Sequence, residues 1–175
     1  MDIAGISQIF AIILLCKESN TRLVVKKIEN CDPKFNYPFK LSVRTYNRPD
    51  AQYFDVNCTW PVDMDSTIGV TMQFDYVLVG RSMPILRAKE NYLCDSANKY
   101  LGEPWYDACR QANIPVKKCP IPKGFYQLKN FKFDSEKMGV KSLPFGMITS
   151  KSVIFNNRNQ DILACIIAEV DNIEK

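Results

Sequence analysis

Residues 92–126 read YLCDSANKYLGEPWYDACRQANIPVKKCPIPKGFY, and this stretch is the most informative part of the sequence. Its cysteines enclose a lobe in which residues 88–101 and 104–112 are predicted to form short helices before several prolines break the chain into loop. The lobe ends in Cys119-Pro120 and leads into an aromatic, strand-like segment. No group of residues in it is typical of a catalytic site. A cysteine-closed lobe beside an apolar strand is typical of a small secreted protein that encloses a hydrophobic ligand.

Alternation of apolar and polar residues, the signature of a half-buried strand, flanks this lobe on both sides. It is longest over residues 67–79, TIGVTMQFDYVLV. Residues 161–170, DILACIIAEV, are apolar on both faces and predict a central, buried strand. The predicted strands are 40–46, 52–60, 67–79, 124–133, 147–155 and 161–170. Short strands separated by turns at this spacing predict an all-β fold, an antiparallel sandwich or cup.

The first residues predict a secretory leader. An apolar run from Ile9 to Leu15 is followed by polar residues, and it is too short to span a membrane. We therefore expect a signal peptide over residues 1–19 and a single domain over residues 20–175, because no linker or repeat divides the rest. The alternative for the leader is a buried N-terminal strand or helix.

The cysteine count agrees with secretion. The chain has seven cysteines, and removing Cys16 with the leader leaves an even set, as an extracellular disulfide framework requires. The remaining six are Cys31, Cys58, Cys94, Cys109, Cys119 and Cys165. The sequence alone does not fix how these six pair.

Several function classes are disfavoured by composition. The chain has no histidine and no CxxC motif, so we expect no metal site, no cofactor and no His-based catalysis. Asp63, Asp65 and Asp75 lie close in sequence, but no nucleophile accompanies them, and turn carboxylates explain them better. The formal net charge is +4 with basic residues scattered along the chain, so we expect no nucleic-acid partner. We predict that the protein is not an enzyme.

Short motifs of the chain recur in one known family in the same order and at similar spacing. They are Asn30-Cys31-Asp32, Cys94-Asp95, Gly102-Glu103-Pro104, Cys119-Pro120, Gly124-Phe125-Tyr126-Gln127-Leu128, Leu143-Pro144, Gly146 and Ala164-Cys165-Ile166-Ile167-Ala168. In these motifs the chain resembles the ML lipid-recognition superfamily, and within it the ganglioside activator. The insect chemosensory A and B secreted proteins are the closest in style.

The resemblance implies an immunoglobulin-like sandwich of two antiparallel sheets with a lipid-sized cavity between them. It also implies the disulfides Cys31–Cys165 and Cys94–Cys119. Cys58 and Cys109 are left, and by elimination they would form a third pair that the family does not supply. The ganglioside activator carries eight cysteines, two more than this chain without its leader.

The candidate ligand-binding residues are the apolar face of the longest alternating strand and aromatic or aliphatic residues near a rim. They are Ile68, Val70, Met72, Phe74, Tyr76, Phe125, Phe131, Phe145, Met147 and Ile148. From pattern alone, an ordinary filled sandwich core explains the first five better, and it is the resemblance that favours a ligand-binding role for them. Three aromatic residues are interpreted as loop residues that touch a membrane: Trp60, Trp105 and Tyr106. For Trp105 the alternative is that its side chain caps the lobe.

The function that these expectations favour is a secreted binding protein for a lipid or other hydrophobic small molecule. The resemblance extends this to pheromone or taste perception, with a membrane surface or a receptor as a possible further partner. The alternative is an extracellular protein-interaction module, or a lipid presenter that activates an enzyme and has no catalysis of its own.

Overall fold

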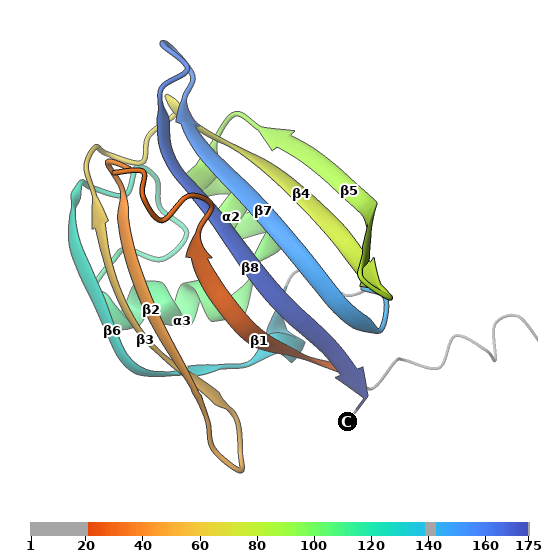
Figure 1. The fold of residues 1–175 in the computed structure, drawn as a ribbon. Helices are drawn as coiled ribbons and strands as arrows, with labels where there is room; N and C mark the ends of the chain where they lie inside the picture. Colours follow the sequence, from red (N-terminus) through yellow and green to blue (C-terminus); the bar gives the residue numbers. More distant parts are fainter. Residues whose placement is uncertain (1–20, 139–142, 175) are drawn as a thin grey trace, which may run out of the picture.

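Two antiparallel β-sheets face each other in the computed structural model, which describes residues 21–138 and 143–174 (Figure 1). One sheet has five strands in the order β1-β8-β7-β4-β5, and the other has three in the order β2-β3-β6. Their bounds are β1 Thr21–Asn30, β2 Lys40–Asn47, β3 Gln52–Trp60, β4 Ile68–Leu78, β5 Arg81–Glu90, β6 Gly124–Phe133, β7 Gly146–Asn156 and β8 Ile162–Glu174. The predicted all-β, two-sheet antiparallel sandwich is confirmed.

The strands predicted from alternation form close to their expected bounds. β3 covers Gln52–Trp60, and β8 lies between β1 and β7, as its two apolar faces predict. Two further strands were not predicted. β1 precedes the first predicted strand, and β5 has the sequence RSMPILRAKE, in which Pro84 interrupts any alternation. A β-bulge at Ile85 of β5, opposite Phe74 and Asp75 of β4, shifts the register at this edge of the sheet.

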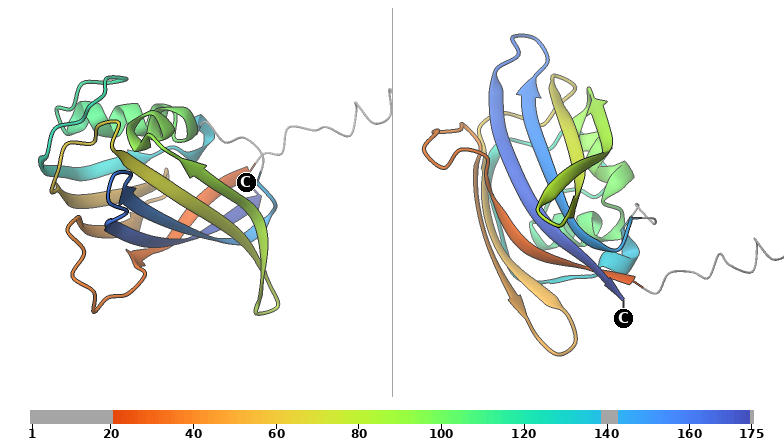
Figure 2. Two further views of the ribbon diagram at one scale, coloured as in Figure 1. Left: turned by 90° about the horizontal axis from the view of Figure 1, so that it is seen from above. Right: turned by 45° about the vertical axis from the view of Figure 1, so that its right-hand side comes forward.

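The predicted helices form within a disulfide-closed lobe, although the first begins later than expected. α2 spans Leu93–Tyr100 and α3 spans Glu103–Gln111, because residues 88–90 complete strand β5. Figure 2 shows both helices along one side of the sandwich, where α2 contacts β4 and α3 contacts β6. The lobe therefore bridges the two sheets along one side, whereas β1 and β2 contact each other on the other.

Two separate hydrophobic cores hold this arrangement together. The main core lies between the sheets and contains Phe39, Ile68, Val70, Ile154, Leu163 and Ala164. The lobe core contains Met64, Cys94, Cys109, Ile114 and Ile121. Trp60, at the end of β3, packs against both. No helix within residues 21–138 and 143–174 is long and apolar enough to cross a membrane, and the predicted leader lies outside the described residues.

Two disulfides form among the residues that the structure describes, and they are the pairs that the resemblance implies. Cys31–Cys165 joins the end of β1 to β8 across 134 residues of sequence, and Cys94–Cys119 joins α2 to the loop before β6 across 25. The third pair, predicted by elimination, is wrong: Cys58 and Cys109 both carry free thiols. Cys58 packs against the main core from β3, whereas Cys109 belongs to the lobe core, so the two thiols lie in different clusters.

We expect the stability of the protein to depend on the Cys109 thiol at alkaline pH. Burial raises the pKa of Cys109 from its ordinary value of 9.0 to about 11. The unfolded chain therefore loses this proton near pH 9, while the folded chain keeps it until about pH 11. The thiol's contribution is complete below pH 9 and is lost as the pH rises towards 11, by at most about 2–3 kcal/mol.

The measurement is the free energy of unfolding in denaturant at several pH values between 8 and 11. Other groups also titrate there, so a Cys109→Ala variant serves as the control. The difference between the two proteins should shrink across this window. A difference that stays constant with pH would show that the thiol ionises equally in both states.

Candidate functional site

The strand register identifies the face of the five-stranded sheet that points towards the other sheet. Val70, Ile154 and Ala164 lie in one row across β4, β7 and β8, and all three belong to the main core. Leu41 and Cys58, which pair across β2 and β3, pack against this core from the three-stranded sheet. Because side chains alternate between faces, every second residue from these positions also lies on an inner face.

The middle of this inner face carries small side chains. Ser150 of β7 lies opposite Phe74 on β4 and Ala168 on β8, and Ser152 lies opposite Met72 in the next row. All five side chains are only half-buried, although β7 is the central strand of its sheet. The centre of a filled sandwich excludes solvent, so these exposures indicate that the two sheets do not close on each other here.

On the side of this middle section that lies away from the main core, buried side chains occur again on the inner face. Ile148 is buried and lies in one row with Val170 and Val25 across β7, β8 and β1. The buried Gln52 side chain ties β3 to β1 there, since its Nε2 donates to the Val25 carbonyl (2.8 Å) and its Oε1 accepts from the Val25 amide (2.9 Å). The half-buried middle section therefore lies between the main core and the contact of Gln52 with Val25.

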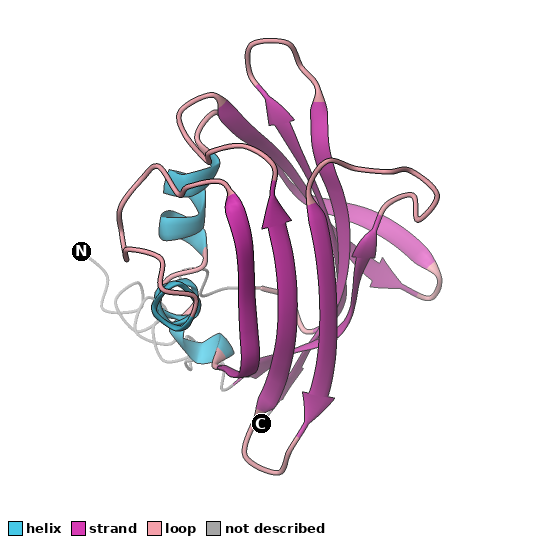
Figure 3. Ribbon diagram, turned by 90° about the vertical axis from the view of Figure 1, so that its left-hand side faces the viewer, coloured by secondary structure: helices cyan, strands magenta, loops and turns pink. Residues whose placement is uncertain are grey.

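A row of exposed apolar residues follows the hairpin of β4 and β5. β5 is the edge strand of the five-stranded sheet. Met83 and Leu86 are about half exposed and lie opposite Tyr76 and Phe74, hence on the inner face. In Figure 3 the helices lie beside one edge of the strands rather than over the faces of the sheets. The exposed apolar residues of the hairpin are Leu78, Val79, Met83, Ile85 and Leu86, which we call the hairpin rim.

The structure brings some of the predicted ligand-binding residues together. Met72, Phe74 and Tyr76 of β4 share the inner face with Ile148, and Phe131 lies opposite Phe54 on the three-stranded sheet. Contact of these residues with a ligand stays a prediction. Ile68 and Val70 instead belong to the main core, as the ordinary-core interpretation proposed.

Three other predicted residues lie elsewhere. Phe125 pairs with Thr59, one position from the inward Cys58, so it lies on the outer face and is 63% exposed. Met147 lies next to the inward Ile148 and therefore faces outwards. Phe145 precedes β7 and is about half exposed. Sequence reasoning missed Ser150, Ser152 and Ala168, although the run MITSKSVIF does place serines at the apolar positions of its alternation.

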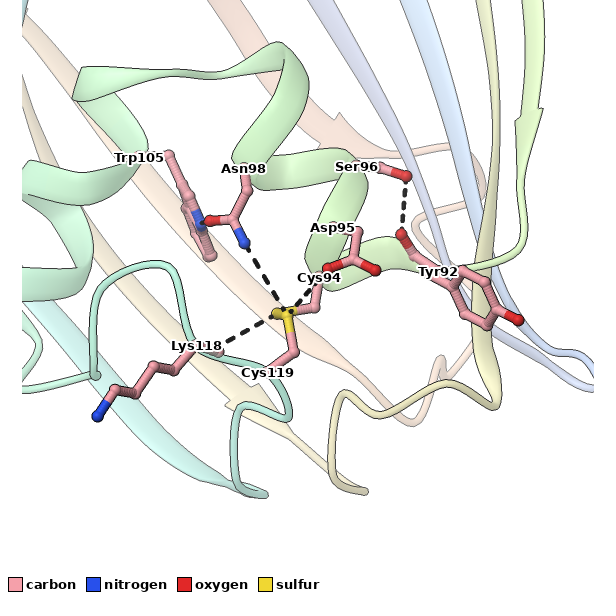
Figure 4. Close-up of a disulfide and its surroundings, with 8 residues drawn as sticks. All are labelled: Tyr92, Cys94, Asp95, Ser96, Asn98, Trp105, Lys118 and Cys119. Atoms are coloured by element: carbon pink, nitrogen blue, oxygen red, sulfur yellow. Dashed lines mark hydrogen bonds between the residues drawn. A yellow bond between two sulfur atoms is a disulfide. The ribbon is translucent and has the colours of Figure 1, made fainter.

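Two aromatic residues of α3 hold the lobe together, and one of them, Trp105, lies beside Asn98 in Figure 4. Trp105 packs against the lobe core, and its indole Nε1 donates to Oδ1 of Asn98 (3.2 Å). The Tyr106 hydroxyl donates to the Asn98 carbonyl (3.0 Å). Trp60 belongs to a strand rather than a loop. The cap interpretation of Trp105 is thus the one that the geometry favours, and the loop placement of Trp60 is wrong.

One polar contact connects the lobe to the edge of the five-stranded sheet. The Tyr100 hydroxyl of α2 donates to the Glu90 carboxylate at the end of β5 (2.5 Å), and the Lys99 ammonium lies 3.5 Å from the same oxygen. The hydrogen bond from Tyr100, followed by the charge of Lys99, lowers the pKa of Glu90. Both partners are solvent-accessible, so this contact positions the lobe and gives no sign of acid–base chemistry.

The three carboxylates considered for catalysis are used in local structure. Asp65 accepts from the amide (2.8 Å) and hydroxyl (2.6 Å) of Thr67, and these hydrogen bonds lower its pKa. Asp63 accepts from the Lys123 amide, and Asp75 accepts from the Gln73 amide group. In the part of the chain that the structure describes, no group of three or more Cys, Asp or Glu side chains is arranged to hold a metal ion.

A groove of about 860 Å³ opens at the end of the sandwich where β1 begins. Charged residues of both signs line it, including Arg22, Arg48, Asp50 and Lys132. Its lining within the described ranges includes none of the ten predicted ligand-binding residues. Because its lining charges are mixed, this groove does not suit a purely apolar ligand.

Comparisons with known proteins give a loose structural likeness only. No family model matches the chain, and no curated protein matches it. A crystal structure of chicken MD-1 complexed with lipid IVa is similar with 17% identity and a TM-score of 0.39, covering 90% of this chain and 94% of that one. A Niemann-Pick type C2 protein from Japanese carpenter ant is similar with 14% identity and a TM-score of 0.29, covering 85% and 86%. Likeness at this level carries no argument about ligand or partner.

Proposed function

We propose that the protein binds a lipid or another hydrophobic small molecule between its two sheets. The observation that carries this proposal is the half-buried middle section of the inner face, formed by Met72, Phe74, Ser150, Ser152 and Ala168. Small residues there remove volume from the interior, and the apolar neighbours offer a surface that water solvates poorly. Two serine hydroxyls give such a site a few polar groups, as small-molecule sites usually have.

The protein carries its ligand in this proposal and does not transform it, since the three carboxylates considered for catalysis are used in turns and along a strand. The two disulfides support secretion, because disulfides persist in oxidising compartments. The motif resemblance supports the ML lipid-recognition superfamily as its relatives and the perception of pheromones or tastants as its setting. A membrane surface or a receptor would then receive the ligand.

The hairpin rim favours a second candidate function, an extracellular interaction module. Val79 is 93% exposed, and the four other apolar residues of the rim are about half exposed. Exposed apolar patches often mark protein interfaces. In that case the middle section would be solvated but would hold no ligand, and a partner protein would cover the rim.

The test is a fluorescence titration of the secreted, disulfide-bonded protein with a dansylated fatty acid. In a Ser150→Leu, Ala168→Leu variant, two larger side chains fill the middle section. We expect its dissociation constant for the probe to rise at least about tenfold, with the melting temperature unchanged or higher. The matched control is Thr149→Leu, which adds the same side chain to the outer face of β7.

Two results would count against the lipid carrier. One is unchanged probe affinity in the filled variant, which would place the probe elsewhere. The other is a protein that binds no probe and whose organic extract contains no lipid. If the probe still binds the filled variant and Val79→Ser with Leu86→Ser abolishes its binding, the rim is the site and the interaction module is the better description.

A further inference from the structure

A second hollow lies on the outer face of the five-stranded sheet, away from the proposed lipid site. It has a volume of about 440 Å³ and crosses β5, β4 and β7. Gln73 on β4 lies opposite Arg87 on one side and Lys151 on the other, and the next residue on this face, Thr71, lies opposite Lys89. Three cationic side chains from two strands therefore flank the polar residues of the strand between them.

These cations are not neutralised by the protein. All three are exposed, and among residues 21–138 and 143–174 none of them forms an ion pair with a carboxylate. The Lys89 ammonium lies over the Phe155 ring, 5.3 Å from its centroid. Asp75, the next outward residue of β4, holds the Gln73 amide group with both carboxylate oxygens (3.0 and 2.8 Å).

The geometry suits an anion that bridges several cations. Neighbouring strands lie about 4.8 Å apart, so the backbones of Arg87 and Lys151 are separated by about 10 Å, within reach of two long side chains that converge on one ligand. Holding three like charges together is unfavourable, and a bound anion relieves this repulsion. Thr71 and Gln73 line the floor and add neutral polar groups.

The surroundings favour a water-soluble polyanion over a membrane. A membrane surface would bury apolar side chains together with the cations. The large exposed residues Met83 and Leu86 lie on the inner face of the same sheet, and Leu78 and Val79 lie at the tip of the hairpin. In the hollow itself the exposed side chains are the cations Arg87, Lys89 and Lys151, whereas the apolar residues of its lining, Met72, Ala88 and Val153, are half-buried. An extended chain with repeated sulfate groups matches this surface, since each sulfate accepts several charge-assisted hydrogen bonds.

We propose that this surface binds a sulfated polysaccharide through Arg87, Lys89 and Lys151. The site is separate from the space between the sheets, and it stands whether or not that space holds a lipid. Binding of this kind releases counterions, so the affinity falls as salt rises. With three cations engaged, the logarithm of the association constant should fall with the logarithm of the salt concentration with a slope of about 2–3.

The experiment is a calorimetric titration of the intact protein with a heparin octasaccharide at several salt concentrations. In an Arg87→Gln, Lys151→Gln variant we expect the dissociation constant to rise at least about tenfold and the salt slope to fall towards 1. The matched control is Arg44→Gln with Lys129→Gln, which removes the same charge from the three-stranded sheet. The control should bind the octasaccharide as the original protein does.

Equal losses in the two variants would overturn the proposal, because net charge alone would then explain binding. So would equally tight binding of desulfated heparin. Vesicles of phosphatidylcholine with one third phosphatidylserine complete the test. If the protein binds these vesicles through Arg87 and Lys151 but not the octasaccharide, the surface is a membrane contact and the proposal is wrong. Dansyl-lipid binding should be unchanged in both variants, which separates this site from the lipid site.

Discussion

Removal of the Cys31–Cys165 disulfide by the paired substitutions Cys31→Ser and Cys165→Ser is expected to lower the free energy of unfolding by about 5 kcal/mol. The disulfide joins positions 134 residues apart, so it restricts the unfolded chain strongly. It also connects the end of β1 to the neighbouring interior strand β8. A loss of this size is comparable to the whole stability of many domains, so we expect the variant to be partly unfolded at 37 °C.

The measurement is denaturant unfolding followed by circular dichroism. The pair Cys94→Ser with Cys119→Ser opens a loop of 25 residues and should cost less, about 3.5 kcal/mol. Cys58→Ala removes a sulfur atom without removing a cross-link and serves as the control. If the shorter loop costs as much as the longer one, restriction of the unfolded chain does not account for the stabilisation.

The second large effect is expected from Met64→Ala, which should lower the free energy of unfolding by about 2–5 kcal/mol. Met64 is 1% exposed and lies in the lobe core with Cys94, Cys109 and Ile121. Its amide donates to the Ile121 carbonyl (2.8 Å), so the backbone is pinned and cannot collapse fully into the space that the lost side chain leaves. The cavity then adds to the lost transfer free energy.

Met83→Ala is the matched control, because the same substitution falls on a side chain that is 45% exposed. It should change the free energy of unfolding by less than about 1 kcal/mol. Hydrogen exchange adds a local readout, since the amides of α2 and α3 should lose protection in Met64→Ala before those of β8 do. Equal stability changes in the two variants would contradict the assignment of Met64 to a closed core.

The sequence predicts the strands whose two faces differ, and it misses the strand whose faces do not. β4 alternates because one face meets the main core while the other meets water. In β5 the residues Arg81–Arg87 are all exposed, so burial imposes no pattern on them, and Pro84 suggests a loop. Phe125 and Met147 show a related limit. Both are large and apolar, but register alone assigns each to the outer face.

The candidate site could be predicted only in part for a similar reason. Alternation identifies Met72 and Phe74 as inward-facing, yet it carries no information on the distance between the sheets. Ser150 and Ala168 contribute to the site because their side chains are small and leave space. The sequence does not reveal this role, because it does not show which residues of the neighbouring strands share their row in the sheet. The cation surface depends on pairing across three strands, and one of these strands was not predicted at all.

β5 lies at the edge of its sheet, and this position has a consequence for solubility. An edge strand exposes backbone donors and acceptors that can template aggregation with other chains. Here Pro84 has no backbone donor in the middle of the strand, and Arg81 and Arg87 on either side would meet like charges in an antiparallel copy. The residues that make this strand hard to predict from sequence thus also disfavour the pairing of its edge with a second copy of the chain.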